Sequence, residues 1–167
     1  MKRLEKKLNN QFSVIVMRVF IGWHFFYEGI IKAYNSDWSA KAYLMNSEGL
    51  LKEFFQWLGS DNLIGIVDMT NIGVLLFVGL TLILGIFEKP AALIGALLLL
   101  LYTLAYPPFP WLNQGLVEGN YWLINKNLIE LAALLVIYQT TTGHIFGIES
   151  ILEQNSNPEK IKSHEME

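Results

Sequence analysis

Four ionisable side chains, Arg18, His24, Glu28 and Lys32, lie within the long apolar stretch formed by residues 12–33. A stretch of this length is enough to cross the hydrocarbon core of a bilayer, which takes about 20 residues. At about 100° per residue, the four side chains fall within one arc of about 120° on a helix. Each charge costs about 2.5–3.5 kcal/mol in lipid on insertion scales, so this arc must face protein or a water-filled cavity. The pattern predicts one helix of a polytopic bundle.

The composition is that of a small membrane protein. The chain has 167 residues, of which 53% are hydrophobic and only 16% are charged, so it is too apolar for an ordinary soluble domain and too short for two domains. The net charge is −3 and no basic tract interrupts the apolar part, which argues against nucleic acid as a partner. The chain has no cysteine, which excludes a disulfide framework, an iron–sulfur cluster and dithiol chemistry carried by this chain alone.

Three further stretches are long and apolar enough to cross a membrane: residues 62–87, 90–106 and 125–142. The stretch 90–106 contains no charge at all. Residues 47–59 place apolar side chains on one side and polar ones on the other, which predicts an amphipathic helix in the first outer loop. We therefore predict an all-α fold, an integral membrane four-helix bundle over residues 12–152 with this extra amphipathic helix. A basic segment (1–11) precedes the bundle and a polar, disordered tail (153–167) follows it.

The distribution of basic residues predicts the orientation of the bundle. Lys2, Arg3, Lys6 and Lys7 precede the first span, and Lys89 lies in the turn between the second and third spans. Because positive charges collect on the cytoplasmic side, we expect both termini to be cytoplasmic. The chain should be a multi-pass protein of a bacterial-type cytoplasmic (inner) membrane, with the lipid bilayer as its surroundings.

This topology brings polar side chains from three predicted helices to one depth near the outer side. They are the carboxylates Glu28, Asp68 and Glu130 and, beside them, Lys32, Asn71, Asn125, Lys126 and Asn127. Two interpretations stay open: the i,i+4 pairs Glu28–Lys32 and Lys126–Glu130 neutralise each other as structural ion pairs, or these groups bind a ligand and move protons.

Two basic side chains of the first span, His24 and Arg18, differ in the partners that they need. His24 has no second histidine near it in the bundle, so no metal site is predicted. Arg18 lies deep in the predicted span and needs a carboxylate, carbonyl oxygens, a lipid phosphate or an anionic substrate as its partner.

Several segments resemble the DoxX-type family of membrane proteins. Residues 17–32 (MRVFIGWHFFYEGIIK) resemble the first helix of that family, with Arg18, Gly22, Gly29 and Lys32 at its characteristic spacing. Residues 38–44 resemble the loop of the DoxD branch, and residues 122–130 and 143–149 are similar to the start of the last helix and to its glycine-rich end. The family positions matched in this chain are Arg18, Lys32, Asn125, Lys126, Asn127 and Glu130.

The resemblance implies a four-helix integral membrane protein. In the DoxD branch it implies a subunit of a thiosulfate:quinone oxidoreductase, which oxidises thiosulfate to tetrathionate and passes electrons to membrane quinone. A quinone site needs aromatic walls, hydrogen-bond donors and a route for protons. We predict Glu28, Glu130 and His24 as catalytic residues, and Arg18, Lys32, Asp68, Asn71, Asn125, Lys126, Trp23 and Tyr27 as residues that bind substrate or quinone.

Two functions from different classes follow from these observations. The first is a membrane subunit of a quinone-linked oxidoreductase, with quinone as its bound substrate. No metal, haem or iron–sulfur cluster is expected in this chain, so a partner subunit would carry the redox cofactor, and a homo-oligomer is compatible with the pattern. The alternative is a non-catalytic membrane scaffold, anchor or assembly factor for a partner protein. A small-solute transporter is less well supported, because no span shows an interrupted helix.

Overall fold

The computed structural model describes residues 2–109, 120–140 and 142–151, and nearly all of this part of the chain that is regular is helical. The helices are α1 (Lys2–Tyr34), α2 (Lys41–Met45), α3 (Lys52–Leu58), α4 (Ile64–Leu84), α5 (Glu88–Ala105) and α6 (Lys126–Thr140). A short antiparallel hairpin of β1 (Asn120–Tyr121) and β2 (Ile124–Asn125) precedes α6. The predicted tail, residues 153–167, lies outside the described residues.

Three of the helices are long and apolar enough to cross a membrane: Gln11–Tyr34 within α1, and all of α4 and α5. These correspond to the first three predicted spans. The fourth predicted span, 125–142, is occupied by α6, whose 15 residues are fewer than the about 20 that a span usually needs. The described residues therefore give an all-helical protein with three candidate membrane spans.

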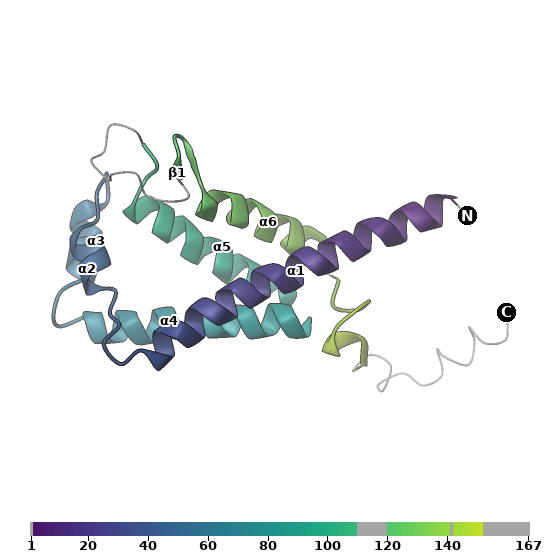
Figure 1. Cartoon of the computed structure of the whole chain (residues 1–167), viewed down its shortest axis with the longest axis horizontal. Helices are drawn as coiled ribbons and strands as arrows, with labels where there is room; N and C mark the ends of the chain where they lie inside the picture. The colour runs from purple at the N-terminus through teal and green to yellow at the C-terminus, as the bar shows by residue number, and fades with distance from the viewer. Residues whose placement is uncertain (1, 110–119, 141, 152–167) are drawn as a thin grey trace.

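The long helices lie side by side and alternate in direction (Figure 1). α1 packs mainly on α4, α5 packs mainly on α6, and contacts between α4 and α5 join the two pairs. One end of the bundle carries α2, α3 and the hairpin, and we call it the loop end. The other end carries the start of α1, the turn between α4 and α5 and residues 142–151, and we call it the terminal end. Both described ends of the chain thus lie at the terminal end.

Small residues let α1 and α4 approach closely. A Cβ atom added at Gly79 of α4 would lie 2.4 Å from the backbone nitrogen of Phe26 in α1, and Gly22 and Gly29 of α1 face α4 in the same way. Such close backbone approach is how membrane helices gain van der Waals contact without a hydrophobic driving force. The core then closes around fully buried apolar side chains such as Val78 and Leu82.

The turn between α4 and α5 lies earlier in the chain than the sequence pattern indicated. Gly85 ends α4 with φ +67°, a left-handed conformation that glycine adopts without strain, and Phe87 follows with φ 50°. α5 consequently begins at Glu88, before the predicted start at residue 90. The expectation that this helix carries no charge was wrong, because Glu88 is part of its first turn and is buried.

The first connection differs from the single amphipathic helix expected over residues 47–59. Two short helices form instead, α2 and α3, and only the second lies inside the predicted range. Leu44 of α2 and Phe55 of α3 pack with Ala105 in a small second core at the loop end. The apolar side chains Leu50, Phe54 and Trp57 remain exposed, so this end presents an apolar surface outward.

Candidate functional site

A cavity of about 320 Å³ opens at the loop end, between the helices. Its floor is apolar and comes from Phe25 of α1, Leu75 of α4 and Leu99 of α5. Its walls come mostly from residues that carry a polar group: His24, Glu28, Lys32, Trp38, Ser39, Ala40, Tyr43, Asn71, Tyr102, Lys126 and Asn127. An apolar floor with a few convergent polar groups is the usual build of a small-molecule site, and 320 Å³ is at the small end of the usual range of about 300–1,000 Å³.

Glu28 and Lys32 form the predicted i,i+4 ion pair on the wall of the cavity. The Nζ atom of Lys32 also lies 5.6 Å from the centroid of the Trp38 ring, in cation–π range. The Lys32 side chain is thus held from two sides, and it is better covered than Glu28, with exposed fractions of 17% and 42%. The carboxylate of Glu28 is the more accessible member of the pair.

Glu130 of α6 pairs across the bundle with His24 of α1, at 2.8 Å between Nδ1 of the histidine and Oε1 of the carboxylate. The sequence pattern had favoured Lys126 as the partner of Glu130. In the described part of the chain Lys126 enters no ion pair, and its side chain lines the cavity instead. The contact between His24 and Glu130 therefore joins two helices and leaves a lysine at the cavity.

Two tyrosines that the sequence patterns did not single out complete the wall. The hydroxyl of Tyr102 donates to Oδ1 of Asn71, and the hydroxyl of Tyr43 donates to the carbonyl of Tyr102 at 3.2 Å. Tyr106 in turn donates to the carbonyl of Tyr43 at 2.8 Å. Burial beside the other two tyrosines raises the pKa of the Tyr43 phenol well above its ordinary value, so this group stays a hydrogen-bond donor at neutral pH.

Besides Arg18, which is described below, four of the predicted binding residues lie away from the cavity lining. Asp68 accepts the backbone N–H of Ala40 at 2.8 Å and so holds the loop before α2. Asn125 is buried and accepts the N–H of Leu128 at 2.9 Å, which caps the start of α6. Trp23 and Tyr27 lie on the outer face of α1, with 60% and 51% of their surface exposed. Their rings therefore do not form the aromatic wall that the sequence suggested, a part that Trp38 and Tyr43 fill.

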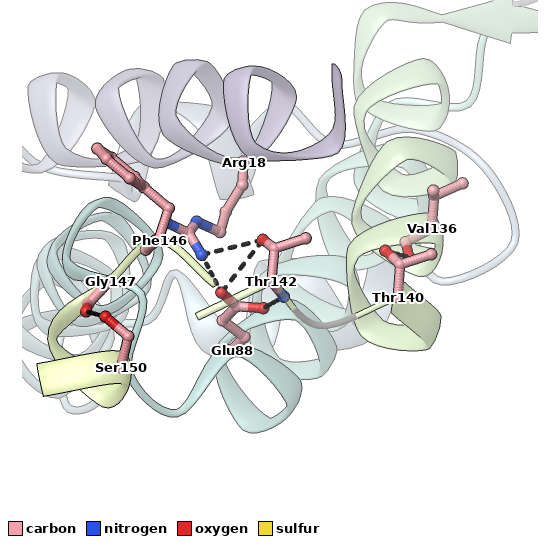
Figure 2. Close-up of polar contacts among 8 residues, drawn as sticks. All are labelled: Arg18, Glu88, Val136, Thr140, Thr142, Phe146, Gly147 and Ser150. Carbon is pink, nitrogen blue, oxygen red and sulfur yellow. Dashed lines mark hydrogen bonds and ion pairs between the residues drawn. The ribbon is translucent and has the colours of Figure 1, made fainter. Parts of the chain in front are cut away.

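Arg18 lies apart from the cavity, in a second polar cluster at the terminal end (Figure 2). It is fully buried and pairs with the carboxylate of Glu88. It also donates to Oγ1 of Thr142 at 3.0 Å and to the carbonyl of Phe146. Glu88 in turn accepts the backbone N–H of Thr142 at 2.7 Å. Two of the partners that the sequence allowed for Arg18, a carboxylate and a carbonyl oxygen, are thus supplied by the chain itself.

This terminal-end cluster acts as a structural junction. The Nη1 and Nη2 atoms of Arg18 lie so close to Gly85 that a Cβ atom there would be 3.0 Å from both. The cluster links α1, the α4–α5 turn and residues 142–151, so it fixes three separate segments with one buried ion pair. The arc of four ionisable groups predicted on α1 thus divides into two sites: Arg18 belongs to the terminal end, while His24, Glu28 and Lys32 belong to the cavity.

The model of the DoxX family matches residues 13–107, which is more than half of the chain. The chain belongs to the DoxX family. No curated protein and no solved structure matches it. Family membership together with the three candidate spans makes this DoxX protein a multi-pass membrane protein in contact with the lipid bilayer. The matched region supplies most of the cavity, whereas Lys126, Asn127 and Glu130 lie beyond it.

The donor set of the cavity indicates what it can bind. Among the described residues, no group of three or more histidine, aspartate or glutamate side chains is placed to hold a metal ion. What the cavity offers is a lysine without an ion pair, amide groups of Asn71 and Asn127, phenol groups and a carboxylate beside an apolar floor. This combination suits a small planar molecule with oxygen acceptors, or a small anion held by Lys126.

Proposed function

We propose that this DoxX protein is the membrane subunit of a quinone-linked oxidoreductase of the thiosulfate:quinone type, and that its loop-end cavity holds the quinone ring. The observation that carries the proposal is the cavity itself: a small apolar floor surrounded by cationic and amide donors, with carboxylates within reach. The two carbonyl oxygens of a quinone need such donors, and its ring needs apolar walls.

Reduction of a quinone takes two electrons and two protons, and the cavity supplies groups suited to deliver protons. The pair of His24 and Glu130 connects α6 to the cavity wall, and the carboxylate of Glu28 is accessible beside Lys32. In the proposed reaction two thiosulfate ions each lose one electron and join as tetrathionate, while the quinone takes up both electrons and two protons to become quinol. Positioned acid–base groups typically contribute about 10²–10⁴-fold to such a step.

The electrons taken from thiosulfate need a redox carrier, and this chain has no cysteine thiolate that could form one or bind one. The full sequence has no cysteine, so iron–sulfur clusters and dithiol chemistry require a second protein. We therefore place a cofactor-bearing partner subunit beside the cavity. The exposed apolar side chains Leu50, Phe54 and Trp57 at the loop end offer a surface where such a partner would bind.

The proposal is tested by replacing carboxylates that lie at the same depth of the bundle with their amides. Glu28→Gln and Glu130→Gln are expected to lower thiosulfate-dependent quinone reduction in membranes by about 100-fold or more, while the amount of inserted protein stays unchanged. Asp68→Asn is the matched control, because Asp68 lies outside the cavity lining and its substitute still accepts the N–H of Ala40. Turnover that survives in both glutamine variants would refute the proposal.

A fourth membrane span is part of this proposal and is supported by how α6 is tied to α5. Asn125, at the start of α6, lies 3.5 Å from the hydroxyl of Thr103 near the end of α5. Thr142, after α6, donates its N–H to Glu88 at the start of α5. Asn125 and Thr142, which flank α6, are thus tied near the two ends of α5. If α5 crosses the membrane, α6 crosses with it.

A non-catalytic scaffold remains a second candidate, favoured by the exposed apolar side chains of the loop end and by the self-contained ion pairs. It predicts a different outcome of the same exchange. Loss of inserted protein in Glu28→Gln and Glu130→Gln, with no effect on turnover per molecule, would favour structural ion pairs over proton transfer.

A further inference from the structure

A second hollow lies next to the cavity, along the line where α1 and α6 meet. These two helices share few contacts, and a broad groove of about 590 Å³ runs between them. Val16 and Phe20 of α1 form one wall, and Ile129 and Ala133 of α6 form the other. Phe20 and Ile129 are largely exposed, so the groove opens sideways toward the surroundings of the bundle, and Phe20 belongs to the candidate membrane span within α1.

The groove is continuous with the cavity through polar side chains. Lys126 lines both hollows. His24 lines the cavity, Glu130 lines the groove, and the hydrogen bond between them spans the boundary. Only 12% of the Glu130 side chain is exposed, against 46% of the His24 side chain. A carboxylate at the inner edge of an apolar groove is costly unless it is paired, and the pairing of Glu130 with His24 places two polar side chains at the boundary between groove and cavity.

We propose that the groove between α1 and α6 holds the hydrocarbon chain of the membrane quinone whose ring occupies the cavity, so that the ring reaches its site sideways from the bilayer, past His24 and Glu130. This inference rests on the proposed function. An apolar chain matches the walls formed by Val16, Phe20 and Ala133, and burying it there adds affinity that scales with its buried apolar area. At the boundary between groove and cavity, the polar ring contacts hydrogen-bond donors of the protein instead of lipid.

The test compares two probes on the full chain purified in detergent: a benzoquinone ring without a side chain, and the same ring with a decyl chain. Binding is followed by quenching of tryptophan fluorescence, since Trp38 lines the cavity. The decyl probe is expected to bind at least about tenfold more tightly than the bare ring. Ala133→Phe fills the groove and is expected to remove this preference while leaving the affinity for the bare ring unchanged.

Leu97→Phe is the control, because Leu97 is exposed on α5 and outside the groove, so partition of the probe into detergent affects it equally. Val16→Phe, on the opposite wall, is expected to act like Ala133→Phe, so the test does not depend on one variant. A preference for the decyl probe that persists in both groove variants would overturn this inference and leave the ring site standing, the groove then holding a phospholipid chain. Failure of both probes to bind the unmodified chain would refute the proposed function and this inference together.

Discussion

At the scale of single residues, Arg18 and Glu88 form an ion pair that is buried inside the bundle. Both side chains are almost completely buried, and Nε of Arg18 has no hydrogen-bond partner in the described part of the chain. Removing one member of a buried pair leaves an unpaired charge, whereas replacing both by uncharged groups is often nearly neutral. We therefore expect loss of one member to destabilise the fold more than loss of both.

This asymmetry gives a testable prediction for stability. Glu88→Gln is expected to lower the free energy of unfolding by about 3–5 kcal/mol, because Arg18 then keeps an uncompensated charge. The double variant Arg18→Met, Glu88→Gln is expected to be more stable than Glu88→Gln alone, because it leaves no unpaired buried charge. In both variants glutamine still accepts the N–H of Thr142. Unfolding by denaturant in detergent, followed by circular dichroism, measures both. The exposed pair Lys41–Asp61 is the control, and its removal should leave the unfolding midpoint unchanged. A double variant less stable than the single one would contradict the argument.

The sequence indicated that Arg18 needs a partner but not which one. Its distance from Glu88, Thr142 and Phe146 along the chain is large, and Glu88 lay in what the pattern presented as a turn outside the helix. The partner of Glu130 was likewise misjudged, because a local i,i+4 spacing toward Lys126 competes with a contact across the bundle that spacing cannot show. Local pairs such as Glu28–Lys32 were predictable; contacts between helices were not.

Helix packing sets the constraints at the scale of elements. α1 and α4 meet through glycines, and two of the three glycines of α4, Gly73 and Gly79, differ sharply in their surroundings. A Cβ atom at Gly79 would collide with the backbone of Phe26, whereas a Cβ atom at Gly73 would meet no atom within 4 Å. One helix thus contains both a site that cannot accept a side chain and a site that can.

Alanine at these two positions separates packing from helix propensity. Gly79→Ala is expected to destabilise the fold by about 1–3 kcal/mol, because the two helices must move apart. Gly73→Ala is expected to leave stability unchanged or to raise it by up to about 1 kcal/mol, through better helix propensity alone. Midpoints of thermal unfolding in the same detergent compare the two variants. Equal effects at both positions would mean that α1 and α4 do not pack as the structure has them.

At the scale of the whole molecule, apolar runs of sufficient length predicted the three long spans, because length and composition are local properties. The cavity was only partly predictable. Glu28, Lys32, Asn71, Lys126 and Asn127 were recognised from their common depth, and His24 from its place on the polar arc of the first span. Trp38 and Tyr43 were not, since a connecting segment that folds back over the bundle leaves no periodic signal. Tyr102 was also missed, because it belongs to α5, whose apolar pattern indicated only a membrane span. These three aromatic side chains complete the walls of the cavity around the polar side chains that share one depth.

The number of spans and the orientation of the chain are tested together by single cysteines, for which this cysteine-free sequence is already suited. Leu50→Cys lies at the loop end, while Lys89→Cys and His144→Cys lie at the terminal end, and all three positions are exposed. Basic residues flank the terminal end, so we expect it to be cytoplasmic. A membrane-impermeant maleimide added to intact cells should therefore label Leu50→Cys at once, and the other two only after permeabilisation.

Each deviation from this pattern has a definite meaning. If the reagent labels both Leu50→Cys and His144→Cys in intact cells but not Lys89→Cys, α6 does not cross the membrane. This result would contradict the fourth span, which is inferred from the contacts of Asn125 and Thr142 with the two ends of α5. Immediate labelling of both terminal-end cysteines, with Leu50→Cys protected, would invert the bundle. The cavity would then open toward the cytoplasm, and its substrates would have to come from that side. The side from which the cavity fills is thus decided by the same three cysteines that count the spans.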